Sequence, residues 1–158
     1  MARTALFRSE VIDRLKELLD AAGIARTDGS DSVQVLHHEP ATMNLEDEVV
    51  WFGETTGDVS VPFMVAGRKV LDDSFTVEVW FAVANPGNEG HEARVRAERL
   101  ASGVADFLQD DPAIDDLDGI LWCTPTGTYR LLAPVAREDG EGFGCAGQLT
   151  VSVKARIQ

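Results

Sequence analysis

The chain has 158 residues, of which 44% are hydrophobic and 26% are charged, as expected for one ordinary globular domain spanning residues 1–158. No run of about 18 apolar residues occurs, and the N-terminal residues lack the apolar core of a signal peptide, so the sequence predicts neither a membrane-spanning helix nor secretion. The formal net charge of −13 argues against a protein that grips nucleic acid phosphates.

The first predicted element is a helix over residues 4–22, where apolar side chains recur at helical spacing. Thr4 is its predicted N-cap, and Gly23 is its predicted C-terminal stop. Residues 33–37 predict a short strand. Residues 38–48, which contain a proline and several acids, predict a loop.

The next part of the chain alternates between β-prone runs and turn-forming residues. Residues 49–52 predict a short strand that Gly53 ends, and residues 54–67 predict a long connection or a loose hairpin through residues 59–65. Residues 73–84 alternate strictly, which predicts a long strand with one apolar face. That face consists of Phe75, Val77, Val79, Phe81 and Val83.

A second helix is predicted over residues 91–109, after a cluster of turn-forming residues at 85–90 and before Pro112. Its apolar positions recur at helical spacing, and several of them are small enough for close packing on a sheet. The predicted buried residues are Ala93, Ala97, Leu100, Ala101, Val104, Phe107 and Leu108.

The C-terminal part predicts two strands, at 120–124 and 128–135, around a turn at residues 125–127. Residues 137–147 predict a loop, and residues 148–157 predict a final alternating strand. Together these elements predict a single α+β domain. Its sheet is mixed and mostly antiparallel, with the N-terminal helix and the second helix packed on one face.

Motifs for metal or catalytic chemistry are weak. His37 and His38 are adjacent, and on a strand they would point to opposite faces, which makes a poor metal pair. The acids of residues 110–118 suggest a calcium loop, but the EF-hand pattern would put Ile114 first and Pro125 twelfth. No nucleophile elbow, P-loop or dinucleotide-binding motif occurs. We therefore expect no metal, no cofactor, no catalytic residue and no enzymatic activity.

Cys123 and Cys145 lie in predicted strands and are expected to be buried, reduced thiols. A disulfide between them would require the two strands to pair, which the sequence leaves open. Core packing is the default expectation for the three tryptophans. Trp80, however, lies on the mixed face of its strand beside Glu78, and is therefore the best candidate for an aromatic side chain at a subunit interface.

Several predicted elements, taken in this order, match the pattern of a known protein family over most of the chain. They are the N-terminal helix, the strand at residues 49–54, the long strand at 75–83 and the closing strand at 151–157. The second helix contributes Arg94, Arg99, Leu100, Ala101, Val104 and Leu108, followed by Asp111 and Pro112. In this pattern the chain resembles a bacteriophage tail terminator protein.

The resemblance implies a virion structural protein without cofactor that forms a ring, expected to be hexameric, at the head-proximal end of a long tail. Such a protein stops polymerisation of the tail tube and joins the tube to the head–tail connector proteins. It would be assembled in the host cytoplasm and would not bind a membrane. DNA would pass through the ring without specific binding, which is consistent with the acidic charge of the chain.

Residues 53–67 and 137–147 are expected to be mobile and are candidates for contacts with ring neighbours or the tube, because long loops often carry contacts. The candidate contact residues are Trp80, Glu54, Asp58, Phe63, Arg68, Arg137 and Phe143. Two other functions stay open: another head–tail completion or minor tail protein, or a small α+β ligand-binding domain. The ligand-binding function predicts a concave pocket with convergent polar groups.

Overall fold

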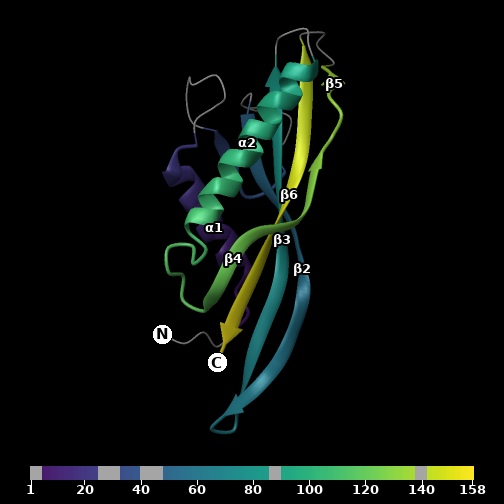
Figure 1. The fold of residues 1–158 in the computed structure, drawn as a ribbon. Coiled ribbons are helices and arrows are strands. Elements are labelled where there is room, and N and C mark those ends of the chain that lie inside the picture. Colours follow the sequence, from purple (N-terminus) through teal and green to yellow (C-terminus); the bar gives the residue numbers. More distant parts are fainter. Residues whose placement is uncertain (1–4, 25–32, 40–47, 86–89, 138–141) are drawn as a thin grey trace.

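The computed structural model describes residues 5–24, 33–39, 48–85, 90–137 and 142–158. Within these residues the chain forms two helices and six strands. Their bounds are α1 Arg8–Ala22, β1 Gln34–Leu36, β2 Glu48–Val65, β3 Arg68–Asn85, α2 Gly90–Asp110, β4 Ile120–Leu131, β5 Val135–Ala136 and β6 Phe143–Ile157. The strands form one sheet in the order β1-β2-β3-β6-β4, with β5 also paired to β6 (Figure 1). Only β1 and β2 pair in parallel, so the predicted mixed, mostly antiparallel α+β fold is confirmed.

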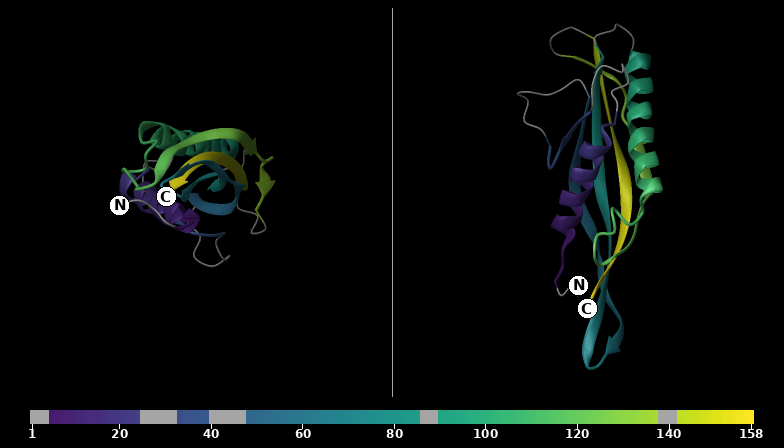
Figure 2. Two further views of the ribbon diagram at one scale, coloured as in Figure 1. Left: turned by 90° about the horizontal axis from the view of Figure 1, so that it is seen from below. Right: turned by 90° about the vertical axis from the view of Figure 1, so that its left-hand side faces the viewer.

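Both helices cover the same face of a strongly twisted sheet (Figure 2). The predicted apolar face of β3 is confirmed, since Phe75, Val77, Val79, Phe81 and Val83 are all buried. The helices bury their apolar stripes in the same core: Val11, Leu15 and Leu19 from α1, and Ala93, Ala97, Leu100, Ala101, Val104 and Leu108 from α2. Burial of apolar surface between these two layers is the main stabilising term of the fold.

The ends of the helices differ slightly from the predictions. α1 begins at Arg8 rather than at residue 4, and no side chain caps its first turn. The predicted N-cap, Thr4, lies outside the described residues. Gly23 ends α1 as predicted, with a left-handed φ of 58° and its N–H donated to the Asp20 carbonyl oxygen. No helix in the described part of the chain is long and apolar enough to cross a membrane.

The largest correction concerns β2 and β3, which form one long hairpin. β2 does not end at Gly53 but continues to Val65, and β3 begins at Arg68 rather than at residue 73. The two strands are joined at Ala66 and Gly67, whose φ angles of 48° and 80° suit the tight two-residue turn of a hairpin. Register shifts between Phe52 and Thr55 and between Ser60 and Phe63 keep the long ladder paired. The predicted long connection is therefore a strand.

The C-terminal strands are also longer than predicted. β4 is one strand that passes through Pro125, where a register shift replaces the predicted turn. It lies at the edge of the sheet, which is where a strand can accommodate a proline. β6 begins at Phe143, so the loop predicted up to residue 147 ends earlier. Residues 40–47, 86–89 and 138–141 of the predicted loops and turn lie outside the described residues.

Candidate functional site

The sheet face opposite the helices is lined by polar side chains and tryptophans. Thr76, Glu78 and Trp80 of β3 point to this face, because they alternate with the buried residues of the core face. Thr150 and Ser152 continue the face on β6, directly across from Glu78 and Thr76. An antiparallel sheet with one buried and one polar face is typical of a sheet that meets solvent or a partner on one side. We call this surface the open face.

Two tryptophans form the centre of the open face. Trp51 of β2 and Trp80 of β3 are directly opposite in the ladder, and their rings stack with centroids 6.3 Å apart and an interplanar angle of 12°. The rings border a hollow of about 750 Å³, which we call the tryptophan–glutamate hollow. Its lining residues are Glu39, Trp51, Phe52, Gly53, Glu54, Glu78, Trp80 and Ala146.

The hollow is acidic and aromatic. The Glu78 carboxylate accepts a hydrogen bond from the Trp80 indole N–H (3.1 Å) and one from the Glu54 backbone N–H (3.4 Å). A side chain at Gly53 would collide with both partners, because an added Cβ would lie 2.9 Å from the Trp80 Nε1 atom and still closer to Glu78. No lysine or arginine lines the hollow, and within the described residues neither Glu54 nor Glu78 forms an ion pair.

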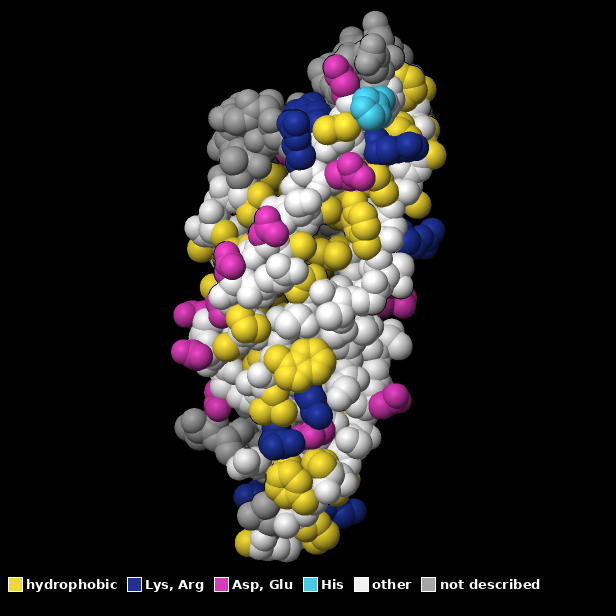
Figure 3. Space-filling view, in the orientation of Figure 1, with side chains coloured by type: hydrophobic (Ala, Val, Ile, Leu, Met, Phe, Trp, Pro, Cys, Tyr) yellow, Lys and Arg dark blue, Asp and Glu magenta, His cyan; other side chains and the backbone are white. Residues whose placement is uncertain are grey.

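The second feature is a projecting part of the β2–β3 hairpin, residues 59–73, which we call the arm. β6 pairs with β3 only from Leu71 onward, and β1 pairs only with residues 49–51 of β2, so the hairpin extends beyond the other strands (Figures 1 and 2). Four large apolar side chains of the arm are 44–59% exposed: Val59, Val61, Phe63 and Met64. Apolar and basic side chains gather over this end of the molecule (Figure 3). Exposed apolar clusters of this kind mark contact surfaces.

The base of the arm is held by ion pairs on the open face. Asp72 is buried and accepts hydrogen bonds from the Arg156 Nε and Nη2 atoms at 2.8 and 2.9 Å. These bonds from the Arg156 guanidinium lower the pKa of the Asp72 carboxyl group. The same guanidinium lies over the Phe63 ring, 5.1 Å from its centroid. Arg156 therefore links the final strand to the arm.

The seven predicted contact residues fall in three places. Trp80 and Glu54 meet at the tryptophan–glutamate hollow. Asp58 lies on β2 next to the arm, and Phe63 and Arg68 lie within it; all three are exposed. Arg137 and Phe143 lie at the opposite end of the sheet, where the Arg137 N–H donates to the Gly142 carbonyl oxygen. Phe143 packs partly against the core. The segment 53–67, predicted to be mobile, instead continues β2 as far as Val65 and forms the hairpin turn at Ala66 and Gly67.

The default expectation for the tryptophans is wrong, because none belongs to the buried core cluster. Trp51 and Trp80 are half-buried on the open face, and Trp122 on the edge strand is 41% exposed. Trp51 lies in a β-prone run, and nothing in that run distinguishes it from a core residue. Its role depends on its pairing with Trp80, which only the register reveals.

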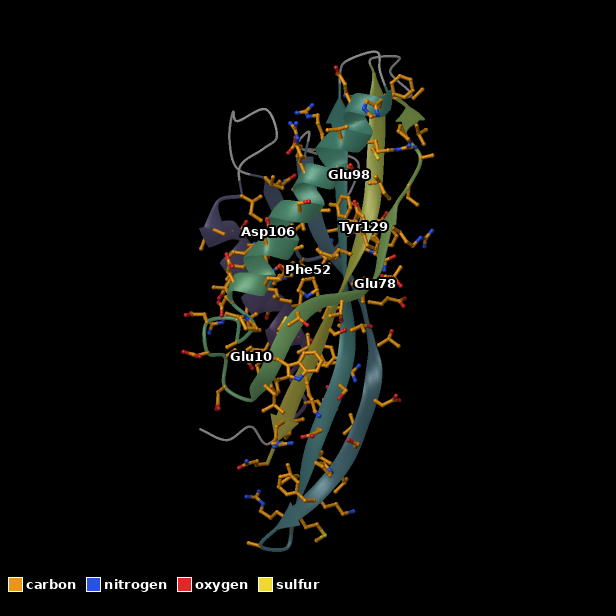
Figure 4. The ribbon with its side chains drawn as sticks, in the orientation of Figure 1. Glu10, Phe52, Glu78, Glu98, Asp106 and Tyr129 are labelled. Atoms are coloured by element: carbon orange, nitrogen blue, oxygen red, sulfur yellow. The ribbon has the colours of Figure 1, made fainter. Side chains whose placement is uncertain are left out.

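A smaller groove of about 340 Å³ lies between α2 and β4. Glu98 borders its α2 side and Tyr129 its β4 side (Figure 4). The Tyr129 ring stacks on Phe81 of the core, and burial raises the pKa of its hydroxyl. The rest of the lining consists of small or apolar side chains, so the groove offers few convergent polar groups.

The described part of the chain offers few residues suited to metal binding or to thiol chemistry. No group of three or more His, Cys, Asp or Glu residues there is placed to hold a metal ion. In the acidic turn after α2, Asp111 accepts a hydrogen bond from the Asp115 backbone N–H. Cys123 and Cys145 are both buried and free, and burial raises the pKa of the Cys123 thiol to about 12.

No family model matches the chain, and no curated protein is significantly similar to it in sequence. The two surfaces that can indicate a function are therefore the arm and the open face with its hollow.

Proposed function

We propose that this protein is a structural component of a long-tailed bacteriophage, a tail terminator that caps the tail tube and joins it to the head–tail connector. The observation that carries the proposal is the arm, which carries four large exposed apolar side chains away from a well-packed body. A projecting apolar element is more useful for contact with another protein than for chemistry on a small molecule.

In this proposal copies of the chain assemble head to tail into a ring, with the arm of each copy reaching its neighbour. Such heterologous contacts close into a ring when the rotation between copies fits. The part of the open face that no neighbour covers would then line the channel. Its hydroxyl and carboxylate groups, together with the net charge of −13, would keep DNA from adhering to the wall.

The proposal is tested by native mass spectrometry of the purified protein and by negative-stain imaging after mixing it with tail tubes. We expect rings in solution or at tube ends, and tubes that stop growing once capped. A Val61→Thr/Met64→Glu variant in the arm should lose assembly, whereas Leu6→Ser, which changes an exposed residue outside the arm, should not. A wild-type protein that stays monomeric and ignores tube ends contradicts the proposal. Binding to connector proteins but not to tube ends would favour another head–tail completion protein.

The tryptophan–glutamate hollow favours a second candidate, a small domain that binds an organic cation. Two aromatic rings and nearby carboxylates are the usual elements of such a site. A thermal-shift titration with choline, free arginine and spermidine tests this function. A large, saturable rise in Tm with one of them, on a protein that remains monomeric, would support it.

A further inference from the structure

We propose that the tryptophan–glutamate hollow of one copy receives the basic tip of the arm from a second copy, with Arg68 and Lys69 as the inserted side chains. This contact rests on the proposed ring function and specifies how neighbouring subunits hold one another.

The protein holds two of its own guanidinium groups in the same way. Arg8 lies over the Phe75 ring at 4.9 Å and forms two hydrogen bonds with Asp73. Arg156 does the same with the Phe63 ring and Asp72. In both places a cation is held between an aromatic face and a carboxylate, a combination that strengthens both interactions.

The hollow contains the same two partners, but no lysine or arginine among the described residues lines it. The stacked rings of Trp51 and Trp80 supply aromatic surface, and Glu54 and Glu78 supply carboxylates. Glu39 adds a third carboxylate at the border. Indole is the best of the aromatic side chains for binding a cation. The chemistry therefore selects a guanidinium or an ammonium group.

The tip of the arm carries such groups. Arg68 and Lys69 directly follow the tight turn, both are exposed, and within the described residues neither forms an ion pair. Several other basic side chains are already engaged, for example Arg14 with Asp115 and Arg96 with Glu48. A chain with net charge −13 thus carries two positive side chains, one on each face of the strand, next to the turn of the arm.

The tip cannot reach the hollow of its own chain. Glu54 is eleven strand residues away from Val65, which corresponds to about 35–40 Å along an extended strand. Figure 4 places Glu78 midway along the sheet, whereas the turn lies at its far end. The occupant must therefore come from another molecule. A donor tip and an acceptor hollow at separate places on one chain give the head-to-tail contact that a ring requires.

A second copy fits better than a free small cation because of what surrounds the tip. Phe63 and Met64 are exposed beside Arg68 and Lys69, and a small ligand in the hollow would leave these apolar side chains uncovered. Insertion of the tip into a neighbour would pair the charges and bury the apolar side chains in one contact.

The test is a charge-swap series measured by native mass spectrometry over a range of protein concentrations. R68E/K69E should raise the concentration needed for half-assembly at least about tenfold, since it places acids against acids. Adding E39K/E54K to the same chain should restore assembly by re-forming opposite charges. The matched control R94E/R99E makes the same charge change on exposed residues of α2 and should assemble as wild type does. Circular dichroism checks that each variant folds.

Tryptophan emission gives a second readout. In a Trp122→Phe background the fluorescence comes from Trp51 and Trp80. Its emission maximum should shift when protein with the wild-type arm assembles, but not when the arm carries R68E/K69E. Rings that form equally well with R68E/K69E, or equal losses with R94E/R99E, overturn this contact and leave the ring proposal standing. A wild-type protein that is monomeric in solution and on tubes overturns both. A saturable shift with choline on a monomer would assign the hollow to a small cation instead.

Discussion

Asp72 and Asp73 are consecutive residues of β3, yet their carboxylates lie on opposite faces of the sheet and bind different arginines. Asp72 accepts two hydrogen bonds from Arg156 of β6, and Asp73 accepts two from Arg8 of α1, at 2.8 and 2.6 Å. Alternation along a strand produces this arrangement. The base of the arm is thereby tied on one face to the final strand and on the other to the first helix, which fixes the direction in which the arm projects.

Removal of the buried Asp73 carboxylate from its ion pair with Arg8 should destabilise the whole domain. Asp73 is almost fully buried, so Asp73→Ala leaves the Arg8 guanidinium without its partner and should lower the free energy of unfolding by about 1–3 kcal/mol. The control is Asp115→Ala, which removes an exposed pair with Arg14 and should cost less than about 1 kcal/mol. Urea denaturation measures both. Equal losses would show that the Asp73 pair adds no more than a surface contact.

The Asp72 pair predicts a pH dependence. Arg156 lowers the pKa of Asp72 in the folded state. The contribution of the Asp72–Arg156 ion pair to the free energy of unfolding is therefore fully present above the ordinary aspartate pKa of about 3.9. It is lost as the pH falls through the lowered value, when the carboxyl group takes up a proton. Tm measured from pH 6 to pH 2 should therefore fall less steeply for Asp72→Asn than for wild type. An Asp72→Asn curve that falls as steeply as the wild-type curve would contradict this contribution.

The buried face of β3 predicts the largest effect of a single truncation. Phe81 is 1% exposed in the centre of the core, and Phe81→Ala should cost about 3–5 kcal/mol through lost burial and the cavity left behind. Val61→Ala in the arm should change stability by less than about 0.5 kcal/mol, because the side chain is exposed in the free chain. A loss below about 1 kcal/mol for Phe81→Ala would contradict the assigned core.

The Cys123 thiol should be inert in the folded protein. Its side chain is fully buried and its pKa is raised to about 12, so almost no thiolate is present at pH 8. In a Cys145→Ser background, reaction with DTNB should proceed only as fast as the protein unfolds, and it should be complete within seconds in denaturant. Rapid labelling of the native protein would show that Cys123 is accessible.

The parts of the fold that sequence could predict are those set by local periodicity. The face of β3 follows from strict alternation, and the buried stripe of α2 follows from helical spacing, since neither depends on which element packs against it. The strand ends could not be predicted in this way. Gly53 was expected to end β2, but the position is glycine because Glu78 and Trp80 of the next strand approach it closely.

The tryptophan–glutamate hollow could not be predicted from the sequence either, because it also depends on contacts between neighbouring strands. Trp51 and Trp80 are 29 positions apart in the sequence. Both strands that hold them were predicted, but only the register of the observed hairpin sets the two rings side by side. Residues 125–127 likewise suggested a turn, although an edge strand can accept a proline that an interior strand cannot. Trp80 and Glu54 were singled out individually, but the site they form is a property of the pairing.

Pro125 has a consequence for how copies meet. β4 is the outermost strand on its side of the sheet, and a proline there supplies no backbone N–H to a strand arriving from another molecule. That margin is thus a poor template for continuous strand addition, the route by which exposed sheets grow into fibrils. In the proposed ring, this edge favours a closed number of copies over open-ended aggregation.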